Sequence, residues 1–266
     1  MKQNNKVLSI QINLNGLSFC IKDYQANTVD HLHDIDFNKT LSPHEILPYL
    51  KEELSSKAVF SQDFQEVIVI HQNELSTLVP NILFNENSSA DYLKFNSKIL
   101  KSDYISHDVL DTLGITNVYV PFVNINNYIF DTFGQFTYKH TTTAFIESIF
   151  QSELSYDEPT FYINLSQDSF EILVLKKNTF LLSNVHEYYS KDDFLYYVLF
   201  TFEQLNLDPE INRVFLSGRI DTKDENFEHL YSYVRNIEFL SDHLDLKQFQ
   251  VSNEDLNKYF VLLNCH

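Results

Sequence analysis

The densest group of potential metal ligands lies in the segment Asp30-His31-Leu32-His33-Asp34-Ile35-Asp36, which holds two histidines and three aspartates. Imidazole nitrogens and carboxylate oxygens are common ligands of zinc and other divalent cations. In a strand, however, alternate side chains point to opposite faces, so the histidines would share one face and the aspartates the other. Because a zinc site needs three or four convergent ligands, we expect an exposed strand end here and assign no metal ligand.

Nucleophilic catalysis has no supported candidate in the sequence. Cys20 lies in an alternating segment, where a free cysteine is usually a small buried hydrophobe, and Cys265 lies where we expect a mobile chain end. His140 precedes three threonines, which is typical of a strand-end histidine beside a helix cap. Arg219 follows a Ser-Gly pair, and we expect it to pair with one of the many carboxylates. We therefore assign no catalytic residue.

Glycine, the residue that phosphate-binding loops need, is scarce in this chain. There are 4 glycines in 266 residues, whereas average usage of about 7% would give roughly 19. Glycine lets backbone amides approach a phosphate without a side-chain collision, and it permits a positive φ. The composition therefore disfavours functions that depend on several glycine-rich loops.

The elements that would position these residues occur in the same order in both halves of the chain. Each half has three strands in which apolar and polar residues alternate, then a helix with a serine N-cap, and then a strand apolar enough to be buried. In the first half these elements fall at residues 7–14, 17–22, 28–37, 43–54 and 66–71, with a hairpin turn at Asn15-Gly16. In the second half they fall at residues 161–165, 170–175, 180–185, 191–205 and 213–218. Further strands are expected at 76–80, 118–121 and 136–140, and further helices at 90–100, 124–133, 144–154 and 224–236.

The two orders also share a short stretch of sequence. Ile12-Asn13-Leu14-Asn15 in the first half matches Ile163-Asn164-Leu165-Ser166 in the second. Because the match falls at equivalent places in both orders, it indicates an internal duplication. The polar segment Glu153–Pro159 separates the halves, so we expect lobes of residues 1–155 and 156–266. Whether the final helix and strand, from Asn253 onward, pack back onto the first lobe stays open.

This duplicated order resembles the actin-like ATPase superfamily, which includes actin and the sugar kinases. Several local segments also look like one uncharacterised Bacteroidetes family assigned that fold. These segments are Thr77-Leu78-Val79-Pro80, Tyr92-Leu93-Lys94-Phe95-Asn96, and Asn124-Ile125-Asn126-Asn127 through Phe133-Gly134 to His140. The resemblance covers nearly the whole chain in element order. It implies a mixed α/β protein with a duplicated actin-like (ribonuclease H-like) fold and two lobes around a cleft.

The resemblance also implies where the phosphate loops lie. In the superfamily, the turn between the first two strands of each half binds nucleotide phosphates, and an aspartate that ends the first strand is soon followed by glycine. Here Asn13 and Asn164 stand at the two aspartate positions. Gly16 lies in the first turn, whereas the second turn has no glycine. Asp168 lies near the second turn, but it would need a shifted register to replace the missing aspartate.

The element that binds adenosine in the superfamily usually ends a strand with two glycines, and Ser217-Gly218 keeps one of them. The cleft candidates that the resemblance implies are therefore Asn13, Asn15, Gly16, Asn164, Ser166, Asp168, Ser217 and Gly218.

The two asparagines change the chemistry that these turns can do. The superfamily's aspartates hold hydrated magnesium and orient or deprotonate the attacking water. Asparagine accepts hydrogen bonds, but it has no charge and cannot act as a base. We therefore expect ATP hydrolysis to be lost, and we assign neither ATP nor magnesium as a cofactor. The simpler alternative is that all of these are ordinary hairpin-turn residues.

The net charge of the chain limits the classes of partner that we expect it to bind. With 19 Lys and Arg against 37 Asp and Glu, the formal net charge is −18, which disfavours nucleic acid and anionic membrane surfaces. No apolar run reaches the ~18 residues of a membrane span, and two cysteines are too few for a disulfide framework. We expect a cytoplasmic protein without membrane insertion, and the resemblance implies a bacterial one.

Three functions are compatible with these observations. The first is a non-catalytic actin-like protein, a pseudo-ATPase, that acts as a scaffold through an unknown protein partner. The second is a nucleotide-binding actin-like ATPase or phosphotransferase that uses Asp168 or another carboxylate. The third is a cleft-binding module for a different small ligand. The missing charge and glycine in the turns favour the first.

Overall fold

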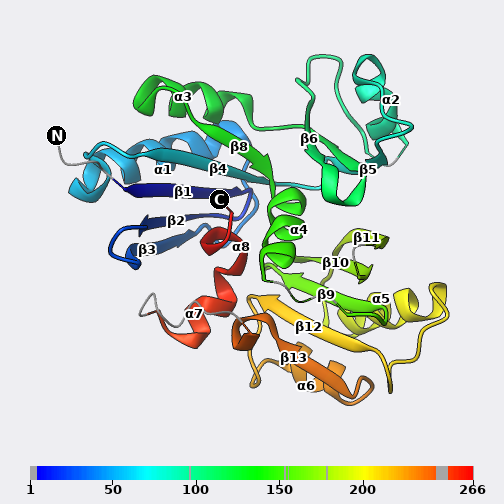
Figure 1. Ribbon diagram of the computed structural model, residues 1–266. Helices are drawn as coiled ribbons and strands as arrows, with labels where there is room; N and C mark the ends of the chain where they lie inside the picture. Colours follow the sequence, from blue (N-terminus) through cyan, green and yellow to red (C-terminus); the bar gives the residue numbers. More distant parts are fainter. Residues whose placement is uncertain are drawn as a thin grey trace. The chain divides into compact units, whose positions relative to one another are not determined.

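The computed structural model describes residues 5–95, 97–152, 154, 156–177, 179–243 and 251–265 (Figure 1). These residues form two units. The first consists of the described residues up to Ala144 and those from Leu262 onward. The second consists of those from Phe145 to His243 together with Val251–Val261. The point of division lies within helix α4 (Thr141–Gln151).

A mixed five-stranded sheet is the centre of the first unit. Its strands are β1 (Lys6–Asn13), β2 (Gly16–Asp23), β3 (Thr28–Asp36), β4 (Glu66–Gln72) and β8 (Thr137–His140). Their order is β3-β2-β1-β4-β8. The pairs among β1, β2 and β3 are antiparallel, whereas β4 is parallel to both β1 and β8. The predicted hairpin is present, but its two turn residues are Leu14 and Asn15, one position before the predicted Asn15-Gly16, and Gly16 is the first residue of β2.

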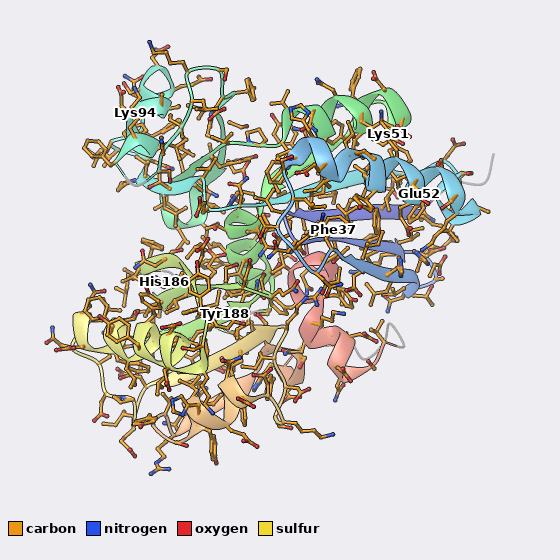
Figure 2. The ribbon with its side chains drawn as sticks, turned by 180° about the vertical axis from the view of Figure 1, so that it is seen from behind. Phe37, Lys51, Glu52, Lys94, His186 and Tyr188 are labelled. Atoms are coloured by element: carbon orange, nitrogen blue, oxygen red, sulfur yellow. The ribbon has the colours of Figure 1, made fainter. Side chains whose placement is uncertain are left out.

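Two helices pack on one face of this sheet. They are α1 (Pro43–Ser56) and α3 (Val123–Phe133). The start of α1 is confirmed at Ser42, whose side chain accepts from the Glu45 amide while the Glu45 carboxylate accepts from the Ser42 amide. This reciprocal capping box satisfies two backbone donors at the helix start. The Nζ atom of Lys51 on α1 lies over the ring of Tyr128 on α3, 5.1 Å from the ring centroid. Lys51 is labelled in Figure 2.

Residues near the end of the chain pack on the opposite face of the same sheet. The Lys22 Nζ atom donates to the carbonyl oxygen of Leu263 (3.3 Å), which ends helix α8 (Phe260–Leu263). The Sγ atom of Cys265 lies 3.3 Å from the Oγ atom of Ser9. The sheet of the first unit is therefore covered on both faces.

A smaller antiparallel sheet is inserted between β4 and α3. Its order is β5-β7-β6, with strands β5 (Ser76–Pro80), β6 (Ser106–Leu110) and β7 (Ile115–Tyr119). Helix α2 (Ser89–Lys94) packs against it, and Val79, Leu93 and Val118 form the buried core. The predicted helix over residues 90–100 is wrong at its end, because α2 ends at Lys94 and Ile99 packs against this core from the chain beyond the helix.

The second unit has a five-stranded sheet of the same kind. Its strands are β9 (Thr160–Leu165), β10 (Ser169–Lys176), β11 (Thr179–Glu187), β12 (Arg213–Gly218) and β13 (Asn236–Phe239). The order β11-β10-β9-β12-β13 corresponds strand by strand to the order of the first sheet. The pairs among β9, β10 and β11 are antiparallel, and β12 is parallel to β9 and β13.

The α-helices that lie wholly within the second unit are α5 (Lys191–Gln204), α6 (Glu225–Tyr231) and α7 (Asn253–Lys258). Helix α5 begins after Ser190, as predicted, and the Ser190 side chain accepts from the Asp193 amide. Aromatic rings fill the core under α5; the rings of Phe161 and Phe202 stack with centroids 4.0 Å apart. Within the described ranges, no helix is long and apolar enough to cross a membrane.

Candidate functional site

The first candidate turn joins β1 to β2 around Asn13 and Asn15. The Oδ1 atom of Asn13 accepts a hydrogen bond from the Asn15 amide (3.3 Å), the contact that defines an Asx turn. The Asn15 carbonyl accepts from the amide of Phe37 (2.9 Å). The carbonyl of Leu14 accepts from the amide of Leu41 (2.8 Å). The turn is thus hydrogen-bonded to the chain that follows β3.

Gly16 allows a close approach between two backbones. A Cβ atom at this position would lie 2.5 Å from the carbonyl oxygen of Ile35 on β3. Such a contact is too short for any side chain, so glycine is required where β2 and β3 begin to pair. The free side of Gly16 therefore faces a strand of the same unit.

The second candidate turn, between β9 and β10, is held by its own backbone and by Tyr188. The amide of Ser166 donates to the carbonyl of Ser169 (2.8 Å). The Tyr188 amide donates to the carbonyl of Asp168 (3.0 Å), and its hydroxyl donates to the carbonyl of Ser166 (3.1 Å). Tyr188, labelled in Figure 2, thus ties the end of β11 to this turn.

The surroundings of Tyr188 favour the protonated form of its phenol. Burial first, and the carboxylates of Asp224 and Asp168 second, raise the pKa of Tyr188 to about 12. The phenol therefore remains a hydrogen-bond donor at neutral pH. Sequence reasoning missed Tyr188, because its partners are backbone carbonyls, which leave no mark in the sequence.

Asn164 and Ser217 form a buried neutral pair on the parallel strands β9 and β12. They are register partners, and the Ser217 hydroxyl donates to the Oδ1 atom of Asn164 (3.0 Å). Both side chains are buried. The amide oxygen at the predicted aspartate position is therefore engaged by a side chain of the same unit.

Gly218 closes the end of β12 against β9. Its φ is +89°, and a Cβ atom would lie 2.0 Å from the carbonyl oxygen of Leu165. The next amide, of Arg219, donates to that same oxygen (2.8 Å). Only glycine fits this left-handed and crowded position. As at Gly16, the space that glycine leaves is filled by a neighbouring strand.

Helix α7 completes the surroundings of Gly218. The Nδ2 atom of Asn257 donates to the carbonyls of Gly218 (3.3 Å) and Ile220 (2.8 Å). Sequence reasoning also missed this contact.

A cavity of about 220 Å³ lies beside the turn, and α7 supplies two of its charged residues. The cavity is lined by Gly218, Arg219, Ile220, Asp221, Asp224, Glu254 and Lys258.

The structure therefore brings the candidates together in two groups, one in each unit. Asn13, Asn15 and Gly16 form the β1–β2 turn of the first unit. In the second unit, Asn164, Ser217 and Gly218 meet where β9 and β12 end, and Ser166 and Asp168 lie in the adjoining β9–β10 turn.

The histidine-rich segment forms most of β3. The imidazoles of His31 and His33 lie on one face, with ring centroids 6.0 Å apart. Asp30 forms an ion pair of 2.7 Å with Lys6, and the hydrogen bond from Lys6 lowers the pKa of Asp30. His33 lies 3.5 Å from Glu53. In the part of the chain that the structure describes, no group of three or more His, Cys, Asp or Glu side chains is arranged to hold a metal ion.

His140 ends β8, as predicted, whereas α4 begins at Thr141 rather than at residue 144, and the His140 side chain itself accepts from the first turn. Its Nδ1 atom accepts from the Thr142 amide (3.2 Å), so its Nε2 atom carries the proton that is donated to the Asn73 carbonyl (3.1 Å). Burial lowers the pKa of His140 to about 4. The ring is therefore neutral at pH 7 and has a structural role.

Both cysteines are buried in the first unit. Burial raises the pKa of Cys20 to about 12 and also raises that of Cys265. Because the thiolate is the reactive form, neither thiol is suited to nucleophilic attack.

Comparison with known proteins supports the fold that the topology indicates. Residues 1–237 match the family described as "Protein of unknown function (DUF3822)". No curated protein matches the sequence. A crystal structure from Bacteroides thetaiotaomicron VPI-5482, described as a protein with actin-like ATPase fold and unknown function, has a TM-score of 0.80 and 18% identity. It aligns over 100% of this chain and 98% of that one.

Two further solved structures are similar. The PilM–PilN type IV pilus biogenesis complex aligns with a TM-score of 0.68 and 12% identity, over 97% of both chains. The ethanolamine utilization protein EutJ from Carboxydothermus hydrogenoformans aligns with a TM-score of 0.51 and 7% identity, over 99% of this chain and 89% of that one. These likenesses confirm the predicted actin-like ATPase fold.

Proposed function

The chain belongs to the DUF3822 family of unknown function, and we propose that it is a non-catalytic actin-like protein that acts as a scaffold by binding another protein. The observation that carries this proposal is the state of the two positions where the superfamily has aspartates. Asn13 caps the first turn, and Asn164 accepts from Ser217 in a buried pair. Neither residue carries a charge or can remove a proton from water.

The residues of both turns fit Mg-ATP poorly. Magnesium is held in phosphate sites by carboxylates together with substrate oxygens. Asn13 and Asn164, at the two positions where the superfamily has aspartates, present neutral amides instead. Phosphate loops also need free backbone amides, but the Ser166 and Arg219 amides donate to carbonyls of the second unit. A neighbouring strand fills the free side of Gly218. On this proposal the chain is a pseudo-ATPase that uses neither ATP nor magnesium.

The solved neighbours support a role in protein binding only by analogy. One is described as the PilM–PilN type IV pilus biogenesis complex, so a chain of similar fold is found assembled with another protein. We propose a protein partner for this chain as well, and a cytoplasmic, bacterial setting. The net charge of −18 disfavours nucleic acid as that partner. The matching strand orders of the two sheets support an internal duplication.

The proposal is tested by thermal unfolding with and without millimolar Mg-ATP, together with phosphate release. A ligand at 100 times its Kd stabilises the folded state by about 2.7 kcal/mol, so binding would raise the melting temperature clearly. We expect no shift and no phosphate release. A shift that disappears in Asn13→Lys, or in a variant of the second turn, would contradict the proposal.

One observation favours a second candidate, the binding of a nucleotide or another small ligand. The cavity of about 220 Å³ beside Gly218 carries both acidic and basic side chains, which include Asp221, Arg219 and Lys258. A thermal shift with a small ligand that Lys258→Ala abolishes would support this alternative.

A further inference from the structure

Helix α5 carries two stacked aromatic side chains on its outer surface. Tyr196 is 59% exposed and Phe200 is 39% exposed. Their rings stack at 5.8 Å with an interplanar angle of 11°. The two residues are four positions apart and therefore lie one above the other on the helix. They form an apolar stripe on the outside of the second unit.

The core does not need this stripe. Phe194, Val198 and Phe202 of α5 are buried against the sheet. Tyr197, on another side of the helix, stacks on His186 of β11 at 4.2 Å with an interplanar angle of 11°. Tyr196 meets this packing only through an edge-to-face contact with Tyr197, at 5.3 Å between ring centroids. Contiguous exposed apolar side chains mark interaction sites.

A side-chain contact connects the stripe to α6. Asp192, one turn before Tyr196, accepts from the Nε2 atom of His229 on α6 (2.8 Å). The His229 ring packs edge-to-face with that of Tyr233, at 5.9 Å between centroids. Tyr233 is 49% exposed. We define the α5–α6 face as Asp192, Tyr196, Phe200, Glu203, His229 and Tyr233.

The negative charge of the α5–α6 face favours a positively charged partner. Lys191 is the only lysine or arginine of α5 and α6, both of which are described in full, and it lies 3.5 Å from Glu225. The same helices carry the carboxylates of Asp192, Asp193, Glu203, Glu225 and Glu228. Aromatic faces beside carboxylates favour guanidinium groups, which stack on rings and pair with carboxylates at once. A second copy of a chain with net charge −18 would be repelled instead.

We propose that the α5–α6 face binds an arginine-bearing segment of a partner protein. The guanidinium groups stack on the rings of Tyr196, Phe200 and Tyr233. They also pair with the carboxylates of Asp192 and Glu203. This inference rests on the proposed scaffold function and adds to it the surface and the charge of the partner. Tyr196 and Phe200 lie ~6 Å apart along α5, so arginines one helical turn apart match them.

The test uses a fluorescein-labelled, alanine-rich helical peptide with arginine at every fourth position, and a peptide of equal charge with lysine at those positions. Fluorescence anisotropy measures the affinity of each. We expect the arginine peptide to bind about tenfold more tightly than the lysine peptide, and Tyr196→Ala/Phe200→Ala to reduce its affinity about tenfold. Tyr196→Phe keeps the ring and should bind like the wild type.

Two controls separate stacking from charge and from misfolding. Tyr49→Ala removes a tyrosine that is 43% exposed on α1 and should leave the affinity unchanged. Asp192→Asn/Glu203→Gln should weaken binding and reduce its dependence on salt. Far-UV circular dichroism and melting temperature must be the same for the double variant and the wild type. If they differ, the single variants Phe200→Ala and Tyr233→Ala give the same comparison.

Equal affinity of the wild type and of a folded variant without the rings would overturn the inference, as would equal affinity for the arginine and lysine peptides. A change in oligomeric state caused by Tyr196→Ala/Phe200→Ala would also overturn it, since the face would then bind a second copy. Failure of this inference can be distinguished from failure of the proposed non-catalytic function. Hydrolysis of Mg-ATP by a chain that still binds the arginine peptide contradicts only the non-catalytic proposal.

Discussion

The hydroxyl of Ser217 donates a 3.0 Å hydrogen bond to the side-chain oxygen of Asn164 across the parallel strands β12 and β9. Both residues are buried, and both are neutral at every pH at which the protein is folded. A carboxylate at the same place would lose most of its hydration and gain one hydroxyl donor. The pair is therefore suited to an amide and unsuited to an ion.

Asn164→Asp is expected to destabilise the protein by about 1–3 kcal/mol at pH 7. Burial should raise the native pKa of the new carboxyl above its unfolded value of about 4. A raised native pKa leaves stability intact at low pH and removes it as the pH rises. Urea unfolding at pH 5 and pH 7 should therefore show a loss that grows with pH. Asn13→Asp, in a half-exposed turn, is the control and should change stability by less than about 0.5 kcal/mol. Wild-type stability of Asn164→Asp at pH 7 would contradict this account.

Gly218→Ala is expected to destabilise the second unit by about 2–4 kcal/mol, because φ is +89° and the new Cβ would lie 2.0 Å from a carbonyl oxygen. Gly114→Ala is the matched control. Its φ is +64°, with no atom within 4 Å of the new Cβ, so only the backbone conformation is penalised, by about 1–2 kcal/mol. Chemical denaturation of both variants measures the difference. Equal losses would show that the contact with β9 is unimportant.

Tyr188→Phe removes the hydroxyl that donates to Ser166 and should reduce the free energy of unfolding by about 0.5–1.5 kcal/mol. The ring remains, so its packing against Phe170 and Phe194 is kept. Tyr49→Phe, at an exposed position of α1, provides the same chemical change as a control. Hydrogen exchange at the Ser166–Ser169 turn should increase in the first variant only, and unaltered exchange there would count against the tie between β11 and the turn.

His140 is expected to make the protein sensitive to mild acid. Burial lowers its native pKa to about 4, whereas the unfolded value is about 6.5. A depressed native pKa gives stability that is complete above pH 6.5 and is lost as the pH falls toward 4, by about 3 kcal/mol in all. His140→Gln should flatten this part of the curve of unfolding free energy against pH. The exposed His44→Gln should leave the curve unchanged, and a similar slope in His140→Gln and the wild type would contradict the assignment.

Local signals predicted much of the fold. Ser42 with Pro43, and Ser190 with Asp193, marked the starts of α1 and α5, because a helix start depends on residues close in sequence. The hairpin of β1 and β2 was equally local. The repeated order of strands then predicted two sheets of matching topology, which the structure contains.

The missed features depend on tertiary contacts. The predicted helix over 224–236 ends at Tyr231, because the following residues join β12 as strand β13 (Asn236–Phe239). Strand β6 (Ser106–Leu110) was missed, since its alternation is weak and its place is fixed by pairing with β7. Tyr188 and Asn257 were missed as site residues for the same reason. Their partners are backbone carbonyls of distant segments.

The contact between Ser9 and Cys265 joins residues that are 256 positions apart. On a ribosome, β1 leaves the exit tunnel long before the residues that cover its outer face exist. At about 5–20 residues per second, Ser9 of β1 and Lys22 of β2 wait some 10–50 s for Cys265 and Leu263. The second unit is synthesised almost entirely within that interval. The order of synthesis therefore leaves this face of β1 and β2 uncovered, and open to a chaperone, for most of the time that the chain is being made.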